Sequence, residues 1–344
     1  SNRRAMYCVK ILADLLDTDK GDAIDIYDFF LNETLAQLHL AMFGFSNDFQ
    51  ENTNKKIRET FKGKNDSYAR KYAFDLLKEV EKSDGPLSEV MCKRESKFKT
   101  KKEEYGNAMT FTFAGHDTTA NTLTWLIFEI CRHPQHYIKL QTEIDTFWSE
   151  KTSNDIVYTD FKKLPFMTRC IMEILRLWTP IPNGTSRELQ EDDYVIGKNN
   201  DNVEVKKGTY IQIPNWTRHR SPLLWGSDVN VFNPEREFKG DEIWDDMVFA
   251  TYNPYSERFS PFAYGPRDCI GKNFSQIEMR IILLHLLKNF TFSIGENDYN
   301  IPDEELSFNA ATLGPRNINN SDLYDNTLGL FVHIYHRNLN TSKL

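Results

Sequence analysis

Phe262-Ala263-Tyr264-Gly265-Pro266-Arg267-Asp268-Cys269-Ile270-Gly271 is the most specific motif in this chain, and a helical pattern follows it. Gly265 and Gly271 let backbone N–H groups approach the Cys269 sulfur, because glycine has no side chain to hold them off. Arg267 and the start of the following helix favour a negative charge at that sulfur. This chemistry suits a soft metal centre held by one thiolate, for which haem is the familiar case. The alternative is a buried structural cysteine beside a turn.

Upstream, the stretch 107–131 predicts a long central helix, because its largely apolar composition implies burial on most sides. Ala114-Gly115-His116-Asp117-Thr118-Thr119 lies in the middle of this helix. A carboxylate beside a hydroxyl is costly in an apolar helix unless it has partners or a function. Asp117 and Thr118 therefore indicate either a functional pair or a polar kink that is satisfied by the backbone.

Two further charged motifs lie between the central helix and the cysteine loop. Glu173 and Arg176 stand at i and i+3, on one face of a helix expected over residues 162–178. Surface helices use such pairs constantly, so this pair alone predicts little. Arg236 follows in the irregular meander within 230–271, and a loop of that length is usually functional or packed around something.

The loop F-x-x-G-x-R-x-C-x-G resembles the haem-binding loop of the cytochrome P450 superfamily. The stretch 114–119 resembles the oxygen-activation motif of that family, and 173–176 with 234–236 resembles its Glu-Arg-Arg cluster. These motifs follow one another in the family's order. In the family an aromatic residue follows the last Arg directly, whereas here Glu237 comes between the two.

This resemblance implies a mainly α protein with small β-sheets (α+β), the cytochrome P450 fold. Residues 1–344 are expected to form a single domain of that fold whose N-terminal part is missing. The residue patterns agree with a helix over 276–290 and with strands at Tyr194–Ile196, Val203–Val205, Tyr210–Ile213 and, as short pieces, within Phe308–Tyr335.

The resemblance also implies the cofactor, haem b, with Cys269 as the axial thiolate ligand of its iron. The residues that it places around this cofactor are Phe262, Gly265, Arg267, Gly271, Ala114, Gly115 and Arg187. Arg187 matches a position whose guanidinium reaches a haem propionate in relatives; the alternative is an ordinary surface Arg on a strand. Glu173, Arg176 and Arg236 are expected to hold the loop in place without taking part in the chemistry.

By the same resemblance the protein is a monooxygenase that inserts one oxygen atom of O2 into a lipophilic substrate, with electrons from an NADPH-dependent reductase or another donor. Asp117 and Thr118 would deliver protons to the bound oxygen. The substrate is expected against Phe111, Phe113 and the turns 181–185 and 311–313. The residues that either contact the reductase or are ordinary surface charges are Arg132, Arg258 and Lys272.

Two alternatives to the monooxygenase remain open. A haem-thiolate isomerase, dehydratase or peroxygenase would keep Cys269, but such chemistry needs no proton relay of the Asp117–Thr118 kind. A truncated fragment that binds haem poorly would not be an enzyme at all.

Composition and cysteine spacing exclude other classes of protein. The net charge of −8 argues against a nucleic-acid binder, and the five cysteines contain no C-x-x-C pair, which argues against structural zinc or a disulfide framework. No apolar run reaches membrane-helix length, so membrane contact is expected only through the missing N-terminal part, at the cytosolic face of the endoplasmic reticulum. The alternative is the peroxisome, because Ser342-Lys343-Leu344 spells a peroxisomal address.

Overall fold

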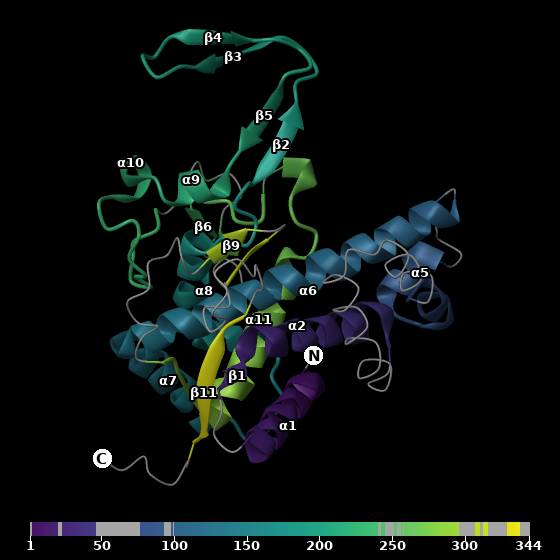
Figure 1. The fold of residues 1–344 in the computed structure, drawn as a ribbon, viewed down its shortest axis with the longest axis vertical. Coiled ribbons are helices and arrows are strands. Elements are labelled where there is room, and N and C mark those ends of the chain that lie inside the picture. Colours follow the sequence, from purple (N-terminus) through teal and green to yellow (C-terminus); the bar gives the residue numbers. More distant parts are fainter. Residues whose placement is uncertain are drawn as a thin grey trace.

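The fold is mainly helical, with small antiparallel sheets, as the sequence predicts (Figure 1). The structure, a computed structural model, describes residues 2–19, 23–45, 76–92, 98, 100–239, 242–244, 251–252, 256, 258–263, 265–295, 307–309, 312–315 and 329–337. The longer helices are α1 (Asn2–Asp19), α2 (Ile26–Leu38), α5 (Pro86–Cys92), α6 (Lys101–Arg132), α7 (Pro134–Ser149), α8 (Pro165–Leu177) and α11 (Lys272–Asn289). The short ones are η1, a π-helix (His39–Phe43), η2 (Tyr158–Lys163), α9 (Asn215–His219), α10 (Pro222–Trp225) and η4 (Gly265–Arg267).

The strand pairs of the described residues are all antiparallel. The one three-stranded sheet among the described residues has the order β1 (Ile24–Asp25), β11 (Phe331–His336), β8 (Phe290–Ser293). The two-stranded pairs are β2 (Thr185–Glu188) with β5 (Tyr210–Ile213), β3 (Asp193–Ile196) with β4 (Asn202–Val205), β6 (Ile243–Trp244) with β7 (Thr251–Tyr252), and β9 (Ser307–Asn309) with β10 (Leu313–Pro315). The strands predicted at 194–196, 203–205 and 210–213 are confirmed, and β3–β4 forms a hairpin that projects from the top of the molecule in Figure 1.

Helix α6 crosses the middle of the molecule, with α2 alongside it (Figure 1). The sequence predicts this helix over 107–131, and the structure confirms it but starts it at Lys101. The Thr100 side chain accepts a hydrogen bond from the Glu103 backbone N–H at 3.2 Å, and acidic residues in the first turn favour the positive end of the helix dipole. The charged first turn of α6, which the apolar sequence pattern does not include, is therefore the capped start of the helix.

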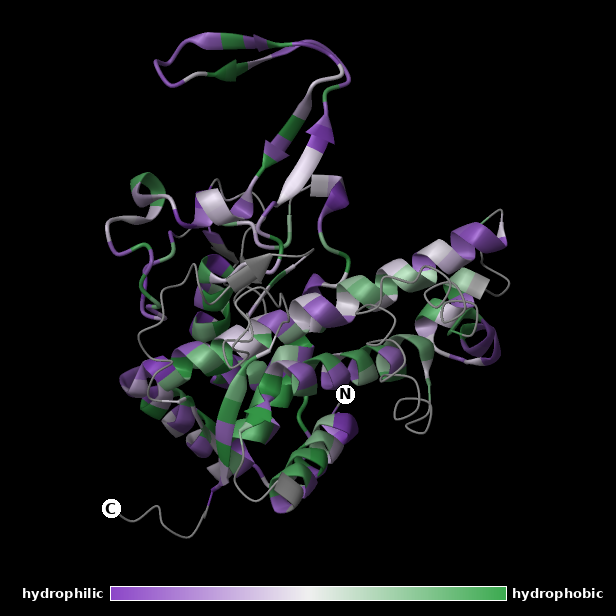
Figure 2. Ribbon diagram, viewed as in Figure 1, coloured by the Kyte–Doolittle hydropathy of each residue, from purple (hydrophilic) through white to green (hydrophobic). Residues whose placement is uncertain are grey.

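The core lies where the C-terminal half of α6 meets α8 and α11, and Figure 2 shows hydrophobic residues gathered there. Trp125 of α6 stacks on Trp178 at the end of α8, with ring centroids 3.8 Å apart and planes 3° from parallel. Each indole N–H has a buried acceptor: Trp125 donates to the Leu313 carbonyl at 3.1 Å and Trp178 to Glu129 at 2.7 Å. This stack fixes α8, and hence the Glu173–Arg176 pair, against the central helix.

The start of α8 is capped by a residue from another helix. Both carboxylate oxygens of Glu143, on α7, accept backbone N–H groups, from Phe166 at 2.7 Å and from Met167 at 2.8 Å. These two bonds satisfy backbone donors that have no partner within the helix. Pro165 occupies the first position of α8, so the helix expected over 162–178 is present but begins at Pro165 and ends at Leu177, and residues 162 and 163 belong to η2.

No helix among the described residues is long and apolar enough to cross a membrane.

A buried ion pair between α1 and α2 predicts a pH-dependent stability. Arg4 contacts Glu33 at 2.9 Å, and burial raises the pKa of Glu33 from 4.5 to about 7 although Arg4 acts against this shift. A carboxyl group whose pKa is higher in the folded state contributes stability that is present below its unfolded pKa and lost as pH rises through the folded value. The contribution of Glu33 to unfolding free energy should therefore fall between about pH 4.5 and 7.

This window can be checked by urea unfolding at several pH values in the wild type and in Glu33→Gln, which cannot titrate. The difference between the two proteins should change with pH between about 4.5 and 7 in favour of the variant. A difference that is flat across this range would contradict the raised pKa of Glu33.

Candidate functional site

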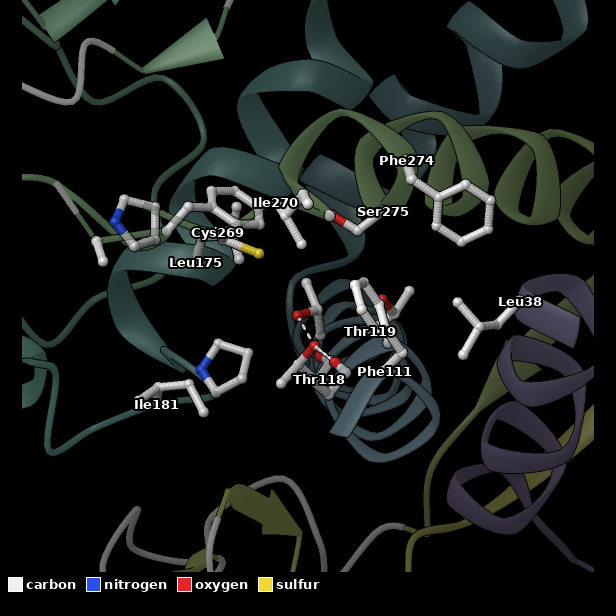
Figure 3. Close-up of a pocket in the computed structure, with 18 of the residues that line it drawn as sticks. Leu38, Phe111, Thr118, Thr119, Leu175, Ile181, Cys269, Ile270, Phe274 and Ser275 are labelled. Carbon is white, nitrogen blue, oxygen red and sulfur yellow. Dashed lines mark hydrogen bonds between the residues drawn. The ribbon is translucent and has the colours of Figure 1, made fainter. Parts of the chain in front are cut away.

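A cavity of about 380 Å³ lies between α6, α11 and the cysteine loop. Most of its lining is apolar, which is typical of sites for small organic molecules and cofactors. The sequence motifs 114–119 and 262–271, about 150 residues apart in the chain, both contribute to its wall. Figure 3 shows the Cys269 sulfur pointing from the loop into this cavity, and Thr118 and Phe111 projecting from α6.

Cys269 is placed by a tight turn before α11. Gly265 has φ +73°, a left-handed conformation that glycine adopts readily, and the Cys269 backbone N–H donates to the Phe262 carbonyl at 2.8 Å. A Cβ on Gly271 would lie 3.8 Å from the Cys269 sulfur, so that position sits directly against the thiol.

The Cys269 side chain is exposed and lines the cavity, and partial burial by the protein around it raises the pKa of its thiol. The backbone N–H groups of Gly271 and Lys272 act in the opposite direction, because they hydrogen-bond the sulfur. A thiol with a raised pKa ionises poorly by itself, whereas a bound metal ion deprotonates a coordinating thiol. One soft donor in an apolar cavity therefore fits haem, whose iron takes a single cysteine thiolate from the protein.

On the opposite wall, α6 presents small residues. Ala114 is exposed to the cavity and Gly115 lines it. A Cβ on Gly115 would come within 2.8 Å of the Leu38 side chain, so this glycine also lets α2 pack closely against α6. Thr118 lines the cavity, and its hydroxyl donates to the Ala114 carbonyl at 2.9 Å.

Asp117 does not share this orientation. It is buried, and its two carboxylate oxygens accept hydrogen bonds from the Tyr27 hydroxyl, at 3.4 Å, and from the Thr312 hydroxyl. Burial, with the Asp117 carboxylate beside it, raises the pKa of Tyr27, so the phenol stays protonated and donates. The structure thus brings Thr118, but not the Asp117 carboxylate, to the cavity wall.

The predicted charged cluster behind the loop is confirmed. Glu173 and Arg176 pair through two bonds of 2.8 and 2.7 Å, and the Arg236 Nε lies 3.2 Å from the same carboxylate. Arg176 also donates to the carbonyls of His219 and Val229, at 2.9 and 2.8 Å. The cluster joins α8 to the segment that leads into the cysteine loop, which is a structural role.

A cytochrome P450 family model matches residues 1–318. The chain belongs to the cytochrome P450 family. Among its relatives are cytochrome P450 CYP13A5 of Caenorhabditis elegans, 32% identical over 217 residues (63% of this chain, 38% of the relative), and cytochrome P450 4F4 of Rattus norvegicus, 35% identical over 183 residues (53% and 32%). The cytochrome P450 monooxygenase tpeC of Talaromyces stipitatus is 31% identical over 206 residues (60% and 38%). The matches thus span well under half the length of these P450 relatives.

The remaining residues that the P450 resemblance places near haem are divided between the cavity and its surroundings. Phe262, Arg267 and Gly271 line the cavity, and Gly265 shapes the turn beside it. Arg187 lies on the exposed strand β2, two residues after Thr185 of the lining, and donates to its neighbour's carbonyl, that of Ser186, at 2.9 Å.

Only some of the residues expected to contact the substrate line the cavity. Phe111 and the turn 181–185 line the cavity, through Ile181, Gly184 and Thr185. Phe113 packs edge-on against His116, with ring centroids 6.4 Å apart. In the turn 311–313, Ala311 lies outside the described residues, whereas Thr312 and Leu313 are buried against α6.

The interpretation of Arg258 as a surface or reductase contact is wrong. Arg258 is buried, forms an ion pair with Glu242, donates to the Leu224 carbonyl at 2.9 Å and stacks over Trp225 at 4.0 Å. A guanidinium with these partners is a structural clamp. Phe238, the aromatic residue displaced by Glu237, packs against Trp225 and Phe259, with ring centroids 5.5 and 5.0 Å apart.

Sequence reasoning missed part of the lining, namely Leu38, Met42, Phe274, Ser275 and Met279. Ser275 and Met279 follow Gly271 at four-residue intervals, the spacing of one helix face. That interval, counted from the loop, could have placed both on the cavity side of α11. Leu38 and Met42 come from the α2–η1 region, whose sequence carries no signal of this long-range contact.

Gly184 is predicted to be irreplaceable in the cavity turn. Its φ is +63°, and a Cβ there would lie 1.9 Å from the Ile213 carbonyl oxygen. Gly184→Ala should therefore cost more than the ~1–3 kcal/mol of a strained conformation alone. Gly208→Ala is the control, because its φ is +84° but its Cβ would meet nothing within 4 Å. Equal losses of unfolding free energy in Gly184→Ala and Gly208→Ala, measured by urea unfolding, would contradict the clash with the Ile213 carbonyl.

Proposed function

We propose that this protein is a haem-thiolate monooxygenase that inserts one atom of O2 into a lipophilic substrate, with electrons from an NADPH-dependent reductase. One observation carries the proposal: the Cys269 sulfur faces Thr118 across a mostly apolar cavity that Ala114 also lines. A thiol on one wall and a hydroxyl in a helix of small residues on the other is the donor set that this chemistry requires.

Haem b would be held by residues on both walls of the cavity. Cys269 would supply the thiolate that binds its iron, and Phe262, Gly265, Gly271, Ala114 and Gly115 would contact the cofactor. Arg267, on the cavity, and Arg187, on the neighbouring strand β2, would pair with the propionates, since guanidinium suits carboxylate.

Bound haem would supply the activation of O2, in which a thiolate ligand favours O–O cleavage. The protein would contribute three things. The apolar lining would exclude water and favour lipophilic substrates. The hydroxyl of Thr118, a residue of the cavity wall, would pass protons into the cavity. The Asp117 carboxylate, on the side of α6 that faces Tyr27, would supply those protons.

The balance of the proposed reaction is RH + O2 + NADPH + H⁺ → ROH + H2O + NADP⁺. One C–H bond is replaced by C–O–H, the second oxygen atom leaves as water, and NADPH provides the electron pair. Labelling tests this directly: with ¹⁸O2, the product should carry one ¹⁸O atom. Product with oxygen from water or peroxide, or an isomer with no added oxygen, would overturn the proposal.

The second candidate is a haem-thiolate isomerase or peroxygenase. It is favoured by the orientation of Asp117, whose carboxylate bonds Tyr27 and Thr312 and does not line the cavity, because such reactions need no proton relay to O2. A peroxygenase would form ROH without NADPH when hydrogen peroxide is added.

Partner and compartment are also proposals. Lys272, which pairs with Asp268 at 2.5 Å beside the cysteine loop, and Arg132, over the Phe128 ring, are the candidate reductase contacts that stay partly exposed. The cytosolic face of the endoplasmic reticulum is the proposed location, and the peroxisome is the alternative on the basis of Ser342-Lys343-Leu344, which lie outside the described residues. Imaging of the protein with and without those three residues distinguishes the two.

A further inference from the structure

A buried polar network connects the central helix to two segments that are distant in sequence. Tyr27, on α2, and Thr312, just before β10, each donate to one oxygen of Asp117, on α6. The three side chains are between 4 and 9% exposed. A buried carboxylate is costly unless it is hydrogen-bonded, and here the bonds come from opposite directions along the chain, 90 residues upstream and 195 residues downstream.

Thr312 is itself held firmly. The Asn121 amide donates to its hydroxyl at 3.3 Å and to the Asp117 carbonyl at 2.9 Å, so one side chain joins the two segments. The next residue, Leu313, accepts from the Trp125 indole at 3.1 Å and donates to the Pro180 carbonyl at 2.9 Å. The Thr312 hydroxyl therefore has a defined position relative to α6.

We propose that Thr312 and Tyr27 are positioning residues for the Asp117 carboxylate. They fix its two oxygens on the side of α6 that faces Tyr27 and Thr312, and the supply of protons from there to Thr118, its neighbour in the chain and part of the cavity wall, depends on that fixed placement. This inference rests on the proposed monooxygenase function. A carboxylate that loses one of two fixed donors samples other orientations, and small misplacements of a proton-transfer group are costly in rate.

Thr312→Val removes the donor and keeps the shape of the side chain. We expect product formed per NADPH consumed to fall roughly threefold or more, with hydrogen peroxide released instead and a larger solvent isotope effect on kcat. KM for the substrate should stay unchanged, because Thr312 is not on the cavity wall. Thr312→Ser, which keeps the hydroxyl, should restore coupling.

Thr124→Val is the matched control. Thr124 is equally buried on α6, but its hydroxyl bonds the Ala120 carbonyl of its own helix. Thr124→Val should form as much product per NADPH consumed as the wild type, even if its free energy of unfolding is lower. If Thr312→Val couples as well as the wild type, or no worse than Thr124→Val, the positioning role is overturned.

A second readout does not depend on activity. In urea unfolding, Asp117→Asn and Thr312→Val should be non-additive, by roughly fivefold or more in the unfolding constant, whereas Asp117→Asn and Thr124→Val should be additive. Additivity in both pairs would overturn the contact. A wild-type protein that forms no oxygenated product would overturn the proposed function and this role together, whereas a productive wild type with an unaffected Thr312→Val overturns this role alone.

Discussion

Glu173→Ala is expected to lower the free energy of unfolding by about 3–5 kcal/mol. Its carboxylate is fully buried and receives Arg176, Arg236 and the Asn233 backbone N–H, the last at 3.1 Å. The substitution leaves the buried Arg176 guanidinium without the charge that neutralises it, and it removes one of the two carboxylates that pair with Arg236, the other being Asp228. Glu173→Gln should recover part of the loss, because it keeps the shape and one acceptor oxygen.

Chemical unfolding followed by circular dichroism measures this effect. Glu204→Ala is the control: Glu204 pairs with Lys206 at 2.5 Å on the exposed β3–β4 hairpin, where an ion pair contributes little. A loss below about 1 kcal/mol in Glu173→Ala would show that the cluster does not hold the meander in place.

Trp178→Ala should produce a loss of similar size, about 3–5 kcal/mol, because a large side chain leaves a cavity that its neighbours only partly fill. The variant removes the stack on Trp125 and the 2.7 Å donor to Glu129. The unfolding free energy of Trp178→Phe should lie between those of the wild type and Trp178→Ala, since this variant keeps a ring in the stack but loses the N–H.

Trp216→Ala serves as the comparison for this second variant. Trp216 is only partly buried, and its ring lies 6.3 Å from Trp178 at an angle of 54°. Its loss in unfolding free energy should be clearly smaller. Equal losses for the two tryptophans would contradict the view that the Trp125–Trp178 stack anchors α8.

Local sequence patterns predict most of the architecture. The apolar period predicts α6, the alternation predicts β3 to β5, and the glycines around Cys269 predict a turn before a helix, because each of these signals acts between near neighbours in the chain. The Glu173, Arg176 and Arg236 cluster was predictable only through the family resemblance, since the spacing of the last residue carries no local signal.

The parts that the sequence did not predict depend on long-range packing. Arg258 is expected from the sequence to be either a reductase contact or a surface charge, yet folding buries it, paired with Glu242 and over the Trp225 ring. The partners of Asp117 come from α2 and from the start of β10, and no periodicity connects such distant segments. The role of each predicted haem contact, and the single domain over residues 1–344, stay predictions.

The most direct test of the central claim is the reduced, carbon-monoxide difference spectrum of the full-length protein and of its Cys269→Ser variant. Cys170→Ser is the control, because Cys170 is fully buried within α8 and does not line the cavity. We expect the red-shifted band of thiolate-ligated haem in the wild type and in Cys170→Ser, and its loss in Cys269→Ser. The same band in Cys269→Ser, or no haem signal in the wild type, would contradict Cys269 as the axial ligand.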